Sequence, residues 1–121
     1  MAKDMDIIVK LLIAIRESEK EPVFDPKCVG ERAVGTDGQN RDTLAIKLKN
    51  EGYITGLITT EDTDNVKLHK VLWEHSRPAV TLAGIEYMSE NRAFKKALGA
   101  MLKAGESAAA AALSAAMGRY L

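Results

Sequence analysis

The chain has 121 residues, with 46% apolar residues, 5% aromatic residues and one cysteine, and its 17 Lys and Arg residues balance 17 Asp and Glu residues. This composition fits one soluble globular domain and excludes a disordered tail, which would have fewer apolar residues or a strong net charge, and a disulfide scaffold, which would have paired cysteines. Zero net charge also removes the simplest electrostatic argument for binding nucleic acid or an anionic membrane, because phosphate neutralisation normally uses a surplus of cations.

No segment has the pattern of an export signal or a membrane span. Lys10 interrupts the first apolar run, from Ile7 to Ile15. The uncharged run from Ser107 to Gly118 is shorter than the roughly 20 apolar residues that a spanning helix needs. The single Cys28 suits a reducing compartment, and we expect it to be a small buried side chain. We therefore expect a cytoplasmic protein.

The first part of the chain predicts two helices. Apolar residues recur at three- and four-residue spacing between Lys3 and Glu17, which predicts a first helix that belongs to the core. The run from Pro22 to Phe24 is long enough only for an edge strand. Asp25 before Pro26 is typical of a helix start, so we predict a second, short helix there, ending at Gly35.

A third helix is predicted from about Asp37 to Glu51, and Gly52 ends it. Thr36 and Gln39 have the spacing of a capping box at its start. Leu44, Ala45 and Leu48 form an apolar side, which we expect to be buried. At 100° per residue the opposite, open arc carries Asp42, Thr43, Ile46, Lys47, Lys49 and Asn50, whereas Arg41 falls on the inward side.

Short strands are predicted after this helix. Tyr53 to Thr60 has the β-branched and aromatic content of a strand, with Gly56 indicating a bulge. After an acidic turn, Val66 to Trp73 is predicted to return as the second strand of a hairpin. Arg77 to Leu82 is predicted to be a further extended piece, because Pro78 disfavours helical backbone at the residue before it.

The C-terminal part predicts helices. Thr81 is predicted to cap a helix from Leu82 to about Glu90, with a kink between Ser89 and Asn91. In the last stretch alanines at near-heptad spacing allow close approach of another helix. We expect this end to pair with a second copy of the chain through Ala97, Ala104, Leu113, Met117 and Tyr120.

Together the elements predict an α+β fold that is mostly helical. The order helix, edge strand, short helix, tight turn, helix, hairpin is typical of a winged helix-turn-helix with a two- to three-stranded β wing. We expect this domain to occupy residues 1–91, and a helical extension that forms a dimer to occupy residues 92–121.

Two segments resemble the YjcQ family of small phage and prophage proteins. They are Leu48 to Ile54 (LKNEGYI) and Val80 to Asn91 (VTLAGIEYMSEN). The resemblance implies a winged-helix domain, with DNA binding as the expected role. The chain departs from the family pattern by a longer segment between Phe24 and Gln39 and by the inward position of Arg41.

The third helix offers DNA-binding chemistry on its open arc, because lysine contacts phosphate or guanine and asparagine pairs with an adenine edge. Charge opposes this role at the predicted wing tip, where Glu61, Asp62 and Asp64 would repel phosphate. Binding would therefore depend on a dimer and a few focused cations. The expected contacts are Thr43, Lys47, Lys49, Asn50, Lys67 and Lys70.

Catalytic and metal chemistry are not predicted. Cys28, His69 and His75 lack the spacing of zinc ligands, and the sequence has no nucleophile elbow, paired-carboxylate site or glycine-rich phosphate loop. We expect no enzyme, cofactor or metal, and predict a transcriptional regulator that binds double-stranded DNA at equilibrium. The alternative is a protein-interaction module on the same fold, with Ile46 and the acidic wing as its contact surface.

Overall fold

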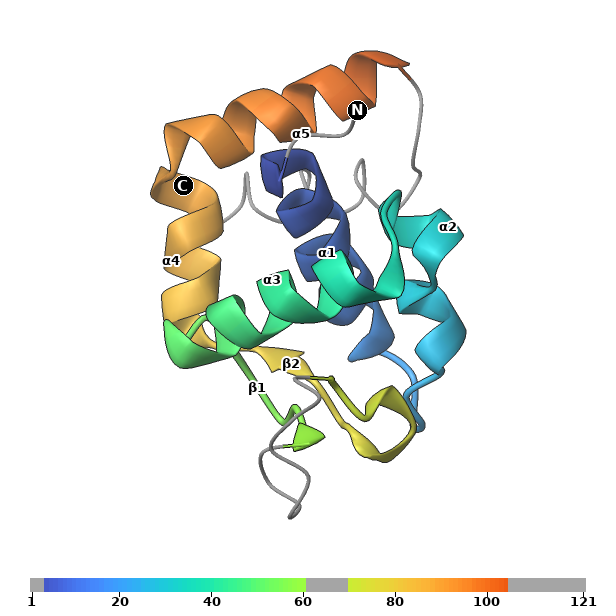
Figure 1. The fold of residues 1–121 in the computed structure, drawn as a ribbon. Coiled ribbons are helices and arrows are strands. Elements are labelled where there is room, and N and C mark those ends of the chain that lie inside the picture. The colour runs from blue at the N-terminus through green and yellow to red at the C-terminus, as the bar shows by residue number, and fades with distance from the viewer. Residues whose placement is uncertain (1–3, 61–69, 105–121) are drawn as a thin grey trace.

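A computed structural model describes residues 4–60 and 70–104 of the chain. Its helices and strands are α1 (Asp4–Ser18), α2 (Glu31–Val34), α3 (Gly38–Asn50), β1 (Ile54–Thr55), β2 (Ala79–Val80), α4 (Leu82–Glu90) and α5 (Arg92–Ala104), with 3-10 helices at Pro26–Val29 and Trp73–His75. The fold is mostly helical with a small antiparallel sheet, as predicted for an α+β protein (Figure 1). None of the described helices is both long and apolar enough to cross a membrane.

Helix α1 forms the centre of the core. It contacts α2, α3, α5 and β2, so several of its sides are covered (Figure 1). A helix surrounded in this way must be apolar on more than one face. Its buried residues are Ile7, Val9, Leu11, Leu12, Ile13 and Ile15, which confirms the prediction that the first helix belongs to the core.

The segment between α1 and α3 differs in part from the prediction. Residues 22–24 form no strand; Phe24 is half-buried instead, with its ring 6.2 Å from the ring of Trp73. The predicted helix start is confirmed, because the Asp25 side chain accepts a hydrogen bond from the Lys27 amide at 3.0 Å. The predicted helix is divided at Gly30, a residue that weakens helices: a 3-10 helix precedes it and α2 follows it.

The sheet pairs β1 with β2, with Ile54 opposite Val80 and Thr55 opposite Ala79. The predicted strand is therefore shorter than expected, and its partner comes from the piece after Pro78. In the described residues, the predicted hairpin is limited to a bridge between Thr59 and Val71. Gly56, at φ +81°, lies just after β1, and the Arg77 backbone approaches it so closely that a Cβ would sit 2.1 Å from the Arg77 carbonyl oxygen.

The chain breaks between α4 and α5 at the predicted position. Thr81 caps α4 by accepting a hydrogen bond from the Gly84 amide at 3.0 Å, and the helix ends at Glu90. Asn91 then caps α5 by accepting from the Phe94 amide at 2.9 Å. Phe94 and Leu98 are buried in the core that α1 forms. The predicted boundary between residues 1–91 and 92–121 falls on this junction, and the division into two units stays a prediction.

Candidate nucleic-acid interface

Helix α3 presents one polar edge to solvent. Its apolar side, formed by Leu44, Ala45 and Leu48, is buried as predicted. Helical spacing places Gln39, Thr43, Lys47 and Asn50 on the opposite side, and all four are exposed. Figure 1 shows α3 crossing α1 on the near side of the molecule. We call these four residues the outer edge of α3.

The start of α3 is fixed by a tight turn. Gly35, at φ +76°, ends α2, and its amide donates to the Glu31 carbonyl at 2.9 Å. Asp37 is the N-cap of α3, because its carboxylate accepts from the Asn40 amide at 2.8 Å. The predicted capping box of Thr36 and Gln39 is wrong by one residue. Because Asp37 caps the helix, the Gln39 side chain is not used in the cap and belongs to the outer edge.

The end of α3 is fixed equally well. The Tyr53 amide donates to the Leu48 carbonyl at 2.9 Å, and the Gly52 amide donates to the Lys49 carbonyl at 3.0 Å. These two bonds, with Gly52 at φ +80°, form a Schellman motif and confirm that Gly52 ends the helix. Both ends of α3 are therefore held by defined hydrogen bonds, so its outer edge has a fixed direction.

Asp42 is not on the open arc, which corrects the prediction. It is 4% exposed, and its carboxylate accepts hydrogen bonds from Trp73 Nε1 at 2.9 Å and from the Val71 amide at 3.1 Å. Arg41 Nε donates to the same carboxylate at 2.9 Å. These donors compensate for the cost of burying the carboxylate. The acidic group that would have opposed DNA binding is thus turned into the protein.

Arg41 lies on the inward side of α3, as predicted. Its Nη1 donates to the Val29 carbonyl at 3.0 Å, and its guanidinium carbon lies 5.5 Å from the centre of the Trp73 ring. Besides pairing with Asp42, this side chain therefore links α3 to the segment before α2. A tryptophan N–H in a core needs an acceptor, and this is the signal in the sequence that could have pointed to Asp42.

Only some of the predicted contact residues lie together. Thr43, Lys47 and Asn50 lie together on the outer edge, although the Thr43 hydroxyl donates to the Gln39 carbonyl at 2.9 Å. Lys49 is half-buried on another side of α3, and Lys70 is exposed just before Val71. Lys67 lies outside the described residues, as do Glu61, Asp62 and Asp64 of the predicted wing tip.

The remaining predicted surface residues occupy other positions. Ile46 is partly buried against the core, so little of it is available as a contact surface. Ala97 is also partly buried against the core, and the side chain of Ala104 is not described. Leu113, Met117 and Tyr120 lie outside the described residues. Dimerisation through these positions stays a prediction.

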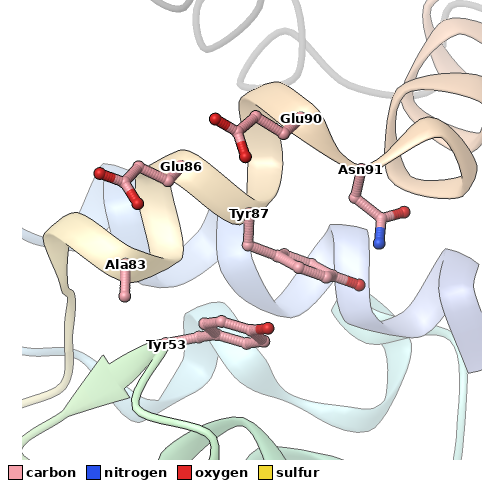
Figure 2. A pocket seen from close by; sticks show the side chains of 6 residues that line it. All are labelled: Tyr53, Ala83, Glu86, Tyr87, Glu90 and Asn91. Carbon is pink, nitrogen blue, oxygen red and sulfur yellow. The ribbon is translucent and has the colours of Figure 1, made fainter.

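A groove of about 350 Å³ lies along α4. It is lined by Tyr53, Ala83, Glu86, Tyr87, Glu90 and Asn91. The rings of Tyr53 and Tyr87 stack with centroids 4.5 Å apart, and Figure 2 shows the two glutamates on the helix above them. Because its charged lining residues are both carboxylates, this groove does not suit a phosphate group.

The sequence matches a known protein family. The family model described as YjcQ protein matches residues 6–105. The comparison with curated proteins found no match, and neither did the comparison with solved structures. Because the matched region covers most of the chain, from the first turn of α1 to the end of α5, the chain belongs to the YjcQ protein family.

Proposed function

We propose that this chain is a winged-helix DNA-binding protein and that α3 is its recognition helix. The observation that carries the proposal is the outer edge of α3. A recognition helix must bury one side and leave the other free for base edges in the major groove, and α3 is divided in this way. Gln39, Thr43, Lys47 and Asn50 then face outward together.

The chemistry of the outer edge suits duplex DNA. Glutamine and asparagine can each bond an adenine edge through two atoms, lysine contacts guanine or phosphate, and threonine contacts several bases. Gln39 and Asn50 are eleven residues apart, about 16 Å along the helix axis. With Asp42 buried, this edge carries one cation and no carboxylate.

The order of elements also supports a winged helix. α1, α2 and α3 occur in the order of that fold, and the turn from Gly35 to Asp37 joins α2 to α3. The strands after α3 are short, with β1 paired to β2 and, among the residues that the structure describes, a single bridge between Thr59 and Val71. We infer that these strands form the base of the wing.

The mechanism that we propose is equilibrium binding by a cytoplasmic homodimer that regulates transcription, without catalysis or a cofactor.

The pKa of the Cys28 thiol supports a mechanism without thiol chemistry. Burial, together with the neighbouring Asp25 carboxylate, raises the pKa of the Cys28 thiol above its ordinary 9.0. A protonated thiol is a poor nucleophile at neutral pH. A phage or prophage origin stays a prediction.

The test is a salt titration of binding to a mixed-sequence duplex. We expect the logarithm of the association constant to fall linearly with the logarithm of salt concentration, and the Lys47→Glu variant to lose most of the affinity. Lys20→Glu is the matched control, because Lys20 is exposed after the end of α1 and the substitution changes the net charge equally. The absence of salt-dependent binding by the wild-type protein would contradict the proposal and favour a protein-interaction module.

A further inference from the structure

Helix α5 carries an unusual concentration of positive charge. Its 13 residues include Arg92, Lys95, Lys96 and Lys103 and no acidic residue, in a chain whose total charge is zero. All four side chains are exposed. Within residues 4–60 and 70–104, none of them has a carboxylate partner within 4.0 Å. We call these four residues the basic stripe.

The fold turns the basic stripe outward. Phe94 is fully buried and Leu98 is 5% exposed, so these two residues fix the side of α5 that faces α1. At 100° per residue, Arg92, Lys96 and Lys103 lie within about 40° of one another and opposite Phe94, and Lys95 lies beside them. Figure 1 shows α5 along the top of the molecule, with α1 below it.

We propose that the basic stripe is a second DNA-contacting surface that binds the phosphate backbone, independently of sequence. This inference rests on the proposed function, because it takes DNA as the partner. Arg92 and Lys103 are separated by about 16 Å along the helix axis. Over that length a duplex carries about ten phosphates on its two strands, which exceeds the four cations of the stripe.

The distribution of apolar residues favours DNA over a lipid surface. A helix that lies in a membrane interface inserts its apolar side among the lipids, next to its basic side. The apolar side of α5 is already used, because Phe94 and Leu98 are buried in the core. The exposed side of α5 therefore offers a partner its positive charges, and a polyanion can be bound by charge alone through release of its counterions.

The experiment compares two double variants with the wild-type protein in the salt titration described above. Lys95→Gln with Lys96→Gln removes two charges of the stripe. Lys20→Gln with Lys27→Gln removes two exposed charges from elsewhere and has the same net charge. We expect the stripe variant to bind all duplexes more weakly, with a salt slope less negative by about 1.8, because each lost phosphate contact contributes about 0.9. The control variant keeps the wild-type slope.

The outcomes separate this inference from the proposed function. If the stripe variant keeps the wild-type slope while Lys47→Glu loses affinity, the stripe proposal is wrong and the α3 proposal stands. If the stripe variant loses affinity while Lys47→Glu does not, the α3 proposal is wrong and the stripe proposal stands. Failure of the wild-type protein to bind any duplex overturns both. Binding to vesicles that contain phosphatidylserine, without binding to duplex DNA, would overturn the stripe proposal in favour of a lipid surface.

Discussion

The carboxylate of Asp42 accepts the indole hydrogen bond of Trp73 at 2.9 Å, which ties α3 to the segment just before β2. The two residues are 31 positions apart in the chain, and both are buried. A second carboxylate oxygen accepts from the Val71 amide. This contact orients α3, since it fixes which side of the helix faces inward, and it therefore bears on both stability and the proposed function.

We expect Asp42→Asn to lower the free energy of unfolding by about 3 kcal/mol, because an amide nitrogen replaces one acceptor and faces a buried donor. Trp73 is the single tryptophan, so its fluorescence follows urea unfolding directly. Glu51→Gln is the control, because Glu51 is exposed and its substitution should change stability by less than about 0.5 kcal/mol. Equal midpoints for the two variants would show that the Asp42 contact contributes little.

The position of Asp42 also shows what the sequence could not predict. Helical periodicity assigns polar residues to the exposed side, because it uses hydropathy alone. Arg41 is a neighbour in the sequence, but the other two donors that make burial of Asp42 favourable come from residues 29 and 31 positions away, and no local pattern indicates those two. Pairing of β1 with β2 was missed for the same reason, since Gly56 and Arg77 meet only in the folded chain.

Local signals were more informative. Asp25 and Thr81 act as caps and Gly52 ends α3, because each uses hydrogen bonds within a few residues. The buried arc of α3 was predicted from its leucines, and with it the outward position of Thr43, Lys47 and Asn50. Gln39 was missed because the capping-box spacing assigned its side chain to the backbone, whereas Asp37 caps the helix.

Three glycines allow a test of how close packing restricts the sequence. We expect Gly84→Ala to destabilise the protein by more than about 2 kcal/mol, because its Cβ would lie 2.2 Å from the Tyr53 carbonyl oxygen. Gly56→Ala should cost at least as much, since positive φ adds to the clash with Arg77. Both values come from urea unfolding.

Gly99 is the matched control for these two positions. It lies inside α5, and a Cβ there would meet no atom within 4 Å in the described structure. Gly99→Ala should therefore raise the free energy of unfolding by about 0.5 to 1 kcal/mol, because alanine has the higher helix propensity. No loss of stability in Gly84→Ala would contradict the packing described around β1, and a loss in Gly99→Ala would contradict the open space described at Gly99 in α5.

Alkaline pH should destabilise the protein through Tyr87. Burial, and to a smaller extent the neighbouring Tyr53, raises the pKa of Tyr87 above its ordinary 10.0. Above about pH 10 the unfolded chain therefore loses this proton more readily than the folded chain, so stability falls as pH rises through that window. Below about pH 10 the stabilisation that the Tyr87 environment provides is fully present.

The measurement compares wild type with Tyr87→Phe in urea unfolding between pH 9 and pH 12. Phenylalanine keeps the ring that stacks on Tyr53 and packs edge-on against Phe94 but has no proton to lose. We expect the variant to show a shallower loss of stability with pH. Cys28 titrates in both proteins and so cancels in the comparison. Parallel pH profiles would show that the environment of Tyr87 does not favour its protonated form.

Two positions on the outer edge of α3 should have separable effects on DNA binding. Asn50 can recognise a base edge, and Lys47 can neutralise a phosphate. In a site selected from random duplexes by the wild-type protein, we expect Asn50→Ala to reduce discrimination against single-base changes by about 1 to 3 kcal/mol at one position, with the salt slope unchanged. Lys47→Gln should instead weaken binding to all sequences and make the slope less negative by about 0.9.

The matched control for this pair is Arg32→Gln, because Arg32 is an exposed cation on α2. If α3 is the recognition helix, Arg32→Gln leaves base discrimination unchanged, because a contact made by α2 is to the backbone. The comparison uses competition between the selected duplex and its single-base variants at one salt concentration. Unchanged discrimination in Asn50→Ala, together with a loss in Arg32→Gln, would show that a surface other than the outer edge of α3 recognises the bases.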